Sequence, residues 1–261
     1  MTKTMKTTAC LAALLTGLAA PAMAAGTAVG LIGDRTLVMI DAETAQVTGM
    51  QPVQIEGRLL GIDYRAPNET LIGVTDGFAV VQIDPMSGEV TEIVQMDREL
   101  PIMEGAPVIV DINPVPDALR FMSGTVNHRV NLGTGEVMVD GELHFDPEAG
   151  IEGAPDVVAT AYSNNLGQPE ATMMFNLDLS RGALLQQTAP NDGTNVMIGA
   201  LGVEVEGPLT FDIGTDAEGT NTAWASAGMM LHQIDLETGM VTGSWEIEGL
   251  DSPLRDLTLM P

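Results

Sequence analysis

A repeating strand–turn–strand unit limits what this chain can fold into more than any other feature of its sequence. Each copy has an apolar strand that ends in Asp or Asn, a short turn that usually closes with Gly, and a second strand of mixed polarity. The Asp or Asn side chain can accept hydrogen bonds from the turn amides, and Gly adopts the positive φ that closes such a turn. The five copies place this residue at Asp41, Asp84, Asn131, Asp178 and Asp235.

The steps between these positions are 43, 47, 47 and 57 residues. A repeat of 40 to 50 residues built from short strands is typical of a propeller blade with four antiparallel strands. Few windows keep apolar residues at helical spacing for more than a turn or two. One more short strand precedes each unit and would be the innermost strand of its blade; these strands are expected at Gly61–Tyr64, Val110–Asn113, Thr160–Tyr162, Phe211–Ile213 and Arg255–Leu257.

The two ends of the chain indicate how such a ring would close. The final strand, Leu254 to Met260, has no later strands to pair with, whereas the strands at the chain start, from Ala28, have no innermost strand of their own. The C-terminal strand therefore completes the first blade most simply, which leaves no long free edge. The sequence predicts an all-β protein and a β-propeller of five blades, with six blades or a two-sheet sandwich as alternatives.

Residues 1–24 have the features of a secretory signal peptide. Lys3 and Lys6 form a positive start, a weakly apolar run follows, and Ala22 to Ala24 has the small-x-small pattern of a cleavage site. The apolar run is too short for a membrane span. We expect cleavage after Ala24, a single domain over residues 25–261, and a bacterial protein in the periplasm or secreted; an uncleaved anchor is the alternative.

Charge and composition exclude several classes of function. The chain has 36 acidic against 10 basic residues and a net charge of −26. Nucleic acid and anionic membrane surfaces both require a basic face, so neither is an expected partner. Cleavage after Ala24 removes both lysines and Cys10, the only cysteine. The remaining chain then cannot use a thiol, a disulfide or a Schiff-base lysine.

Several short elements resemble a family of exported bacterial proteins that carry domain of unknown function 4394. Gly61–Pro67 is similar to its G-I-D-F-R-P element, Ala161–Asn165 to its A-Y-T-N-N element, and Gly207–Ile213 to its G-P-x-x-F-D-I element. The other matching residues follow in order between the first two of these elements, at Asp111–Pro114, Asp117, Leu119, Arg120, Ser123, Asn127, Arg129, Asn131, Thr134 and Gly135.

The resemblance covers nearly all of the chain after the leader. It implies propeller-like β structure and export, and it implies no agreed activity. The chain departs from the family where Leu132-Gly133 replaces the usual Pro-Asp and where Ala118 replaces a common basic residue. It also lacks the C-terminal sorting helix and basic tail of some members, so we expect a released protein with no membrane anchor after cleavage of the leader.

Hydrolytic and zinc sites have little support in the sequence. There is no G-x-S-x-G or H-E-x-x-H motif, and the three histidines, His128, His144 and His232, lie in no recognised motif. A Ser-His-Asp triad assembled from distant segments stays an open alternative, because triads are spatial arrangements.

Calcium fits the chain better, because it binds oxygen ligands and the chain is rich in carboxylates. One arrangement is local: Asp212, Asp216 and Glu218 are spaced along one loop, which is otherwise a solvated hairpin turn. The other is global. Four proposed innermost strands carry an aspartate at comparable points, and the fifth carries Ala161; converging carboxylates are unfavourable without a cation or protons. The four are Asp63, Asp111, Asp212 and Asp256. The alternative is that each aspartate only caps a strand, with Arg120, Arg129 or Arg255 as a partner.

A polar cluster falls within one predicted blade. Its two arginines and several amides could form a pocket for an anion or a sugar, or a buried hydrogen-bond network that fixes the blade. The cluster comprises Asn113, Asp117, Arg120, Asn127, Arg129 and Asn131.

These observations predict an exported, non-enzymatic binding or interaction module whose partner is a protein, a small molecule or a glycan. The alternative is a calcium-dependent hydrolase or lactonase with its metal in the central channel, by analogy with six-bladed lactonase-like propellers. The interruption at Ala161 favours binding.

Overall fold

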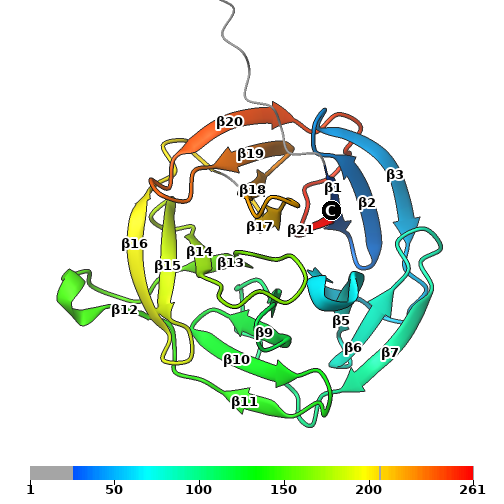
Figure 1. The fold of residues 1–261 in the computed structure, drawn as a ribbon, viewed down its shortest axis with the longest axis horizontal. Helices are drawn as coiled ribbons and strands as arrows, with labels where there is room; N and C mark the ends of the chain where they lie inside the picture. The colour runs from blue at the N-terminus through cyan, green and yellow to red at the C-terminus, as the bar shows by residue number, and fades with distance from the viewer. Residues whose placement is uncertain (1–25, 206, 261) are drawn as a thin grey trace, which may run out of the picture.

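The computed structural model describes residues 26–205 and 207–260, so the predicted leader lies outside the described residues. The described part folds into five small antiparallel sheets arranged as a ring around a central axis (Figure 1). The prediction of a five-bladed β-propeller is confirmed.

Each blade has four consecutive antiparallel strands, ordered from the channel outward. Blade 2 is β4(Leu59–Arg65), β5(Thr70–Thr75), β6(Ala79–Ile83) and β7(Val90–Gln95). Blade 3 is β8(Ile109–Asn113), β9(Ala118–Ser123), β10(Val126–Asn131) and β11(Val137–Val139). Blade 4 is β13(Val157–Tyr162), β14(Met174–Asp178), β15(Ala183–Ala189) and β16(Thr194–Ala200), with the short β12(His144–Phe145) added parallel at its outer edge. Blade 5 is β17(Leu209–Thr215), β18(Asn221–Ala227), β19(Met230–Ile234) and β20(Val241–Glu246).

Blade 1 joins the two ends of the chain, as predicted. Its outer strands are β1(Thr27–Ile32), β2(Thr36–Asp41) and β3(Gln46–Pro52), and its innermost strand is the C-terminal β21(Asp256–Met260). β21 pairs antiparallel with β1, with Leu31 opposite Asp256 and Thr27 opposite Met260. This pairing covers the edge that β1 would otherwise expose.

Burial changes along the radius of each blade. The innermost strands β4, β8, β13 and β17 are almost continuously buried, because each packs between neighbouring blades. The outer strand β3 alternates between exposed and half-buried residues, as expected for a strand with one face in solvent. The apolar cores lie between adjacent blades; Trp224, for example, is buried between blades 5 and 1 and packs on Trp245 at 5.7 Å between ring centroids.

The predicted turn chemistry is present in four blades. Asp41, Asp84, Asn131 and Asp235 each accept two backbone N–H bonds through one side-chain oxygen. Gly88 closes the second of these turns at φ +73°, and a Cβ there would lie 2.1 Å from the carbonyl oxygen of Pro52 on the previous blade. Glycine is therefore required both by the backbone conformation and by close packing between blades.

The structure differs from the prediction at the fourth repeat. Asp178 accepts bonds in its turn, but this turn joins the second and third strands of blade 4, one hairpin earlier than in the other blades. The equivalent turn runs from Ala189 to Gly193, where the carbonyl of Ala189 accepts from Gly193 as that of Asp84 accepts from Gly88. Because Ala replaces the marker Asp, the sequence pattern could not locate it.

Helical structure in the described residues is confined to two short 3-10 turns, η1(Ala66–Asn68) and η2(Pro147–Ala149). No helix within this part of the chain reaches the length and hydropathy that a membrane span requires.

Candidate functional site

The five innermost strands surround the channel, and side chains connect each to the next. Asp63 of blade 2 accepts the N–H of Ile112 of blade 3 at 2.6 Å. Asp212 of blade 5 likewise accepts the N–H of Leu259 of blade 1 at 2.6 Å. These contacts place carboxylates where they bridge neighbouring blades, so they do more than cap their own strands.

The same contacts define one layer of equivalent positions, which we call the channel ring. Blade 1 contributes Thr258, whose hydroxyl accepts the N–H of Tyr64 at 3.0 Å and donates to both Asp63 and Asp212. The complete ring consists of Asp63, Asp111, Ala161, Asp212 and Thr258.

Asp256 does not belong to this layer. Its carboxylate accepts the N–H of Ile62, two residues before Tyr64, and so lies one layer nearer the start of the innermost strands. The prediction that Asp256 occupies a point comparable to Asp63 therefore differs from the structure by two residues. The innermost strands do not pair with one another in a backbone ladder, so the sequence offers no register by which to align them.

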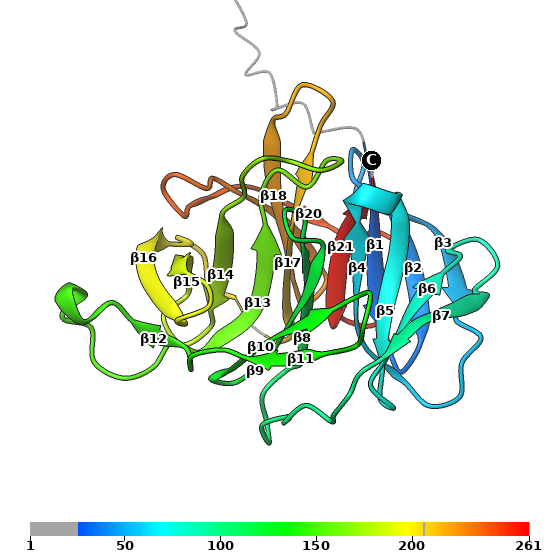
Figure 2. The same ribbon diagram turned by 60° about the horizontal axis from the view of Figure 1, so that its bottom comes forward.

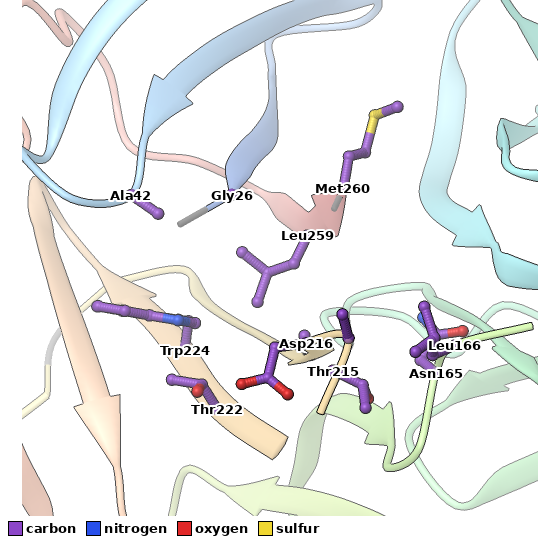
Figure 3. A pocket seen from close by; sticks show the side chains of 12 residues that line it. Gly26, Ala42, Asn165, Leu166, Thr215, Asp216, Thr222, Trp224, Leu259 and Met260 are labelled. Atoms are coloured by element: carbon purple, nitrogen blue, oxygen red, sulfur yellow. The ribbon is translucent and has the colours of Figure 1, made fainter. Parts of the chain in front are cut away.

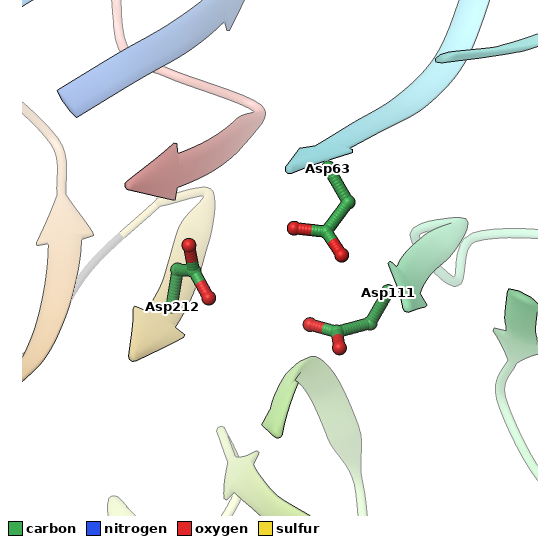
Figure 4. A group of neighbouring side chains, drawn as sticks. All are labelled: Asp63, Asp111 and Asp212. Carbon is green, nitrogen blue, oxygen red and sulfur yellow. The ribbon is translucent and has the colours of Figure 1, made fainter. Parts of the chain in front are cut away.

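Three ring carboxylates converge. Asp63, Asp111 and Asp212 are buried, and one oxygen of each lies within 4.8 Å of the others (Figure 4). Burial raises the pKa of Asp63 well above its usual range, and the negative charge of Asp212 raises it further. Burial also raises the pKa of Asp111 well above its usual range, as do Asp63 and Asp212. Burial raises the pKa of Asp212 to about 6.

Two agents can relieve this repulsion. Ca²⁺ binds oxygen at about 2.3–2.6 Å, so two ligands on one ion lie up to about 5 Å apart. The three carboxylates match that spacing and could hold one ion. Shared protons are the other agent, because a carboxylic acid can donate a hydrogen bond to the neighbouring carboxylate. Ala161 supplies no ligand from blade 4.

The loop that was predicted as a local calcium site is a hairpin turn between β17 and β18. Asp216 accepts the backbone N–H groups of Glu218 and Thr220, while Glu218 is exposed. Asp212 lies in the channel ring and does not join them. The structure thus separates the three residues of that proposed loop site.

The polar cluster of blade 3 separates into a buried network and individual turns. Buried Arg120 donates to Tyr162, Asn127 and Asp140, and Arg129 donates to the same Asp140. Asp140 and Tyr162 were missed by sequence reasoning, because they come from a loop and from the next blade. The remaining cluster members act elsewhere: Asn113 and Asn131 accept turn amides, and Asp117 pairs with Arg65.

A cavity of about 320 Å³ opens at the end of the channel where the innermost strands finish (Figure 3). We call it the Asn165 cavity. Figure 2 shows the β17–β18 hairpin and the loop after β13 on this face. The walls are mainly apolar, and the residues used below are Asn165, Leu166, Asp216, Trp224, Leu259 and Met260.

Asn165 has an unusual environment in this cavity. It is 6% exposed, and its Nδ2 donates to the carbonyl of Tyr64 at 3.5 Å. Its Oδ1 is buried and has no hydrogen-bond partner among the described residues. A buried acceptor without a donor costs about 1–3 kcal/mol. The sequence showed Asn165 only as part of a resemblance to a family element, with no sign of this cavity.

A second cavity of about 470 Å³ opens at the opposite end of the channel. We call it the Arg58 cavity. Each innermost strand contributes to it the residue three positions before its member of the channel ring; these residues are Leu60, Val108, Val158, Leu209 and Arg255. The ring of carboxylates therefore lies between two cavities.

The three histidines lie away from the channel. His128 is on β10, His144 on β12 and His232 on β19, none of which is an innermost strand. Within the described residues, the carboxylate ring thus has no histidine beside it on the channel wall.

A comparison with protein families identifies the chain. The model of the domain of unknown function DUF4394 matches residues 34–258. The chain belongs to this family. Residues from all five blades and the channel ring fall within the matched DUF4394 region, whereas no curated protein matches the sequence.

Solved structures of related shape are distant from this DUF4394 chain. A Bacteroides caccae protein of unknown function shares 13% identity, with 87% of this chain and 75% of that chain covered and a TM-score of 0.41. A luciferin-regenerating enzyme shares 13% identity, with 87% and 76% covered and a TM-score of 0.48. An auxiliary nutrient binding protein from Bacteroides thetaiotaomicron shares 12% identity, with 82% and 53% covered and a TM-score of 0.47. At these values the likeness assigns no function to this chain.

Proposed function

We propose that this protein is an exported binding module that takes a small amphipathic ligand in the Asn165 cavity. The observation that carries the proposal is the unpartnered Oδ1 of Asn165 in the wall of a mainly apolar cavity. Ligand sites in proteins commonly combine apolar walls with a few placed polar groups, in volumes from about 300 Å³ upward.

The chemistry of the walls specifies the ligand class. Oδ1 of Asn165 can only accept a hydrogen bond, so the ligand must carry a donor. The carboxylate of Asp216 also lines the cavity, which favours a positive charge on that donor. Trp224, Leu259 and Met260 offer apolar contact for the rest of the ligand. An alkyl or aromatic amine satisfies all three conditions.

Titration calorimetry with 3-phenylpropylamine tests this proposal, with 3-phenylpropionate as the charge-reversed control. We expect the amine to bind and Asn165→Ala to weaken its binding about tenfold, as expected for the loss of a hydrogen bond to a charged donor. Asp216→Asn retains an acceptor for the turn amides and should weaken binding less, because Asp216 is exposed. Asn68→Ala changes an exposed asparagine outside the cavity and should have no effect.

Two results would contradict the proposal: no binding of the amine at millimolar concentration, or equal loss of binding in Asn165→Ala and Asn68→Ala. Export is tested separately by the N-terminus of the protein recovered from the periplasm or medium, which should begin at Ala25.

Hydrolysis dependent on calcium is less well supported by the geometry. The ring carboxylates supply metal ligands, but hydrolysis also requires a base with access to substrate. The ring is buried, and the histidines lie on other strands. We therefore propose for the ring a role in stability, whether through a cation or through protons, and not in turnover.

A further inference from the structure

We propose that the Arg58 cavity is a second ligand site, specific for small amphipathic carboxylates. This inference is independent of the proposed function, because the cavity lies at the opposite end of the channel and shares no lining residue with the Asn165 cavity.

The mouth of this cavity is apolar on all sides but one. Four of the five innermost strands contribute an aliphatic residue, Leu or Val, and the strand of blade 1 contributes Arg255. Ile102, Pro107 and Leu179 extend the apolar wall. Such a surface would accommodate a hydrocarbon chain of moderate length.

Arginine is the charged residue type that lines this cavity. Arg58 and Arg255 both contribute, although the whole chain has only 10 basic residues against 36 acidic ones. Chance placement in so acidic a protein would favour carboxylates at a cavity mouth. Two guanidinium groups beside an apolar wall complement the carboxylate and the tail of an amphipathic anion.

The two arginines have different tasks. Arg255 donates to the backbone carbonyls of Gly33, Asp34, Leu59 and Leu60, which holds its guanidinium between blades 1 and 2. Arg58 is exposed, and its guanidinium makes no hydrogen bond or ion pair with the described residues. Arg58 is thus available to a ligand, while Arg255 supplies a fixed positive charge.

The two positive charges also oppose each other. Burial lowers the pKa of Arg255, and the proximity of Arg58 lowers it further, while Asp256 and Asp34 act in the opposite direction. Neither Asp34 nor Asp256 lines the Arg58 cavity. An anion bound between the arginines would relieve their mutual repulsion.

Titration calorimetry of the full-length exported chain with decanoate, and with decanol as the neutral control, tests the proposal. We expect decanoate to bind and decanol to bind at least fivefold more weakly. Arg58→Gln should weaken decanoate binding at least fivefold and leave decanol binding unchanged, because it removes charge from an exposed side chain. Arg98→Gln is the matched control, since Arg98 is exposed and does not line the cavity.

Ala106→Phe offers a second variant that reduces the apolar volume without changing charge, and it should weaken both decanoate and decanol. The proposal is overturned if decanoate does not bind at 1 mM, if decanol binds as well as decanoate, or if Arg58→Gln and Arg98→Gln have equal effects. Thermal unfolding of each variant verifies that it remains folded.

Discussion

Aspartates at the rim and at the centre of the propeller differ in what surrounds the same side chain. At the rim, hydrogen bonds from turn amides lower the pKa of Asp41, Asp84 and Asp235 below its usual value. In the channel, burial raises the pKa of Asp212 to about 6 and that of Asp256 to about 7. The difference shows that accepting backbone N–H groups favours the charged form only where solvent also reaches it.

The two sets also connect different parts of the molecule. Each rim aspartate accepts amides from its own turn, two or three residues away. Asp63 and Asp212 accept amides on the next blade, 49 and 47 residues away in sequence. The rim residues therefore shape single hairpins, whereas the channel residues join blades and the closing strand β21.

The largest expected effect comes from removing one channel carboxylate. Asp63→Ala leaves the buried N–H of Ile112 without an acceptor and removes the contact with Thr258. We expect it to lower the free energy of unfolding by about 2–4 kcal/mol. Asp84→Ala, at the rim, should have a much smaller effect. Urea unfolding measures both, and an equal or larger loss in Asp84→Ala would contradict the distinction between rim and channel.

The pH dependence of stability is expected to follow the channel set between pH 4 and 7. The unfolded pKa of Asp is about 3.9. Because the folded pKa values of Asp212 and Asp256 are raised, the folded state binds more protons than the unfolded state in this range. The stability they contribute is fully present below about pH 4 and is lost as pH rises through 6 and 7. The rim aspartates have lowered pKa values, so their contribution is lost only as pH falls below about 4.

Asp111→Asn isolates this effect. Its amide oxygen can still accept the N–H of Tyr162, and its amide nitrogen can donate to Asp63. We expect the melting temperature at pH 8 to rise by roughly 2–4 °C, equivalent to about 1 kcal/mol in a protein of this size, and its decline between pH 5 and 8 to become shallower. Asp216→Asn removes one exposed charge and serves as the control for general repulsion.

The same variant distinguishes a cation from shared protons. A bound cation stabilises the folded state by mass action. If calcium occupies the ring, then millimolar calcium raises the melting temperature of the unmodified protein at pH 8, EDTA lowers it, and Asp111→Asn loses both responses. If protons alone relieve the ring, calcium and EDTA have no effect at pH 8, while the decline with pH remains.

The contrast between rim and channel also explains what could be predicted from sequence. Turn chemistry is local, so Asp84, Gly88 and their counterparts revealed the blade repeat, the innermost strands and the closure by β21. The channel is assembled from strands some 50 residues apart whose relative register is set by side-chain contacts. Asp63, Asp111 and Asp212 were recognised as converging, but Thr258 was missed. Both cavities were also missed, because each combines residues from several blades with no shared motif.

The smallest expected effect concerns the rim turn that lacks its Asp. Ala189 starts the outer turn of blade 4, and it is followed by Pro190 as Asp84 is followed by Pro85. Ala189→Asn would provide an acceptor for the amides of Asn191 and Asp192, as Asn131 does for Gly133 and Thr134 in blade 3. We expect a gain on the order of 0.5 kcal/mol in urea unfolding, with no change in pH dependence because Asn does not titrate. A loss of stability would show that the equivalence of these turns is limited to the backbone, and that packing against β12 on the adjacent edge decides which side chain blade 4 accepts there.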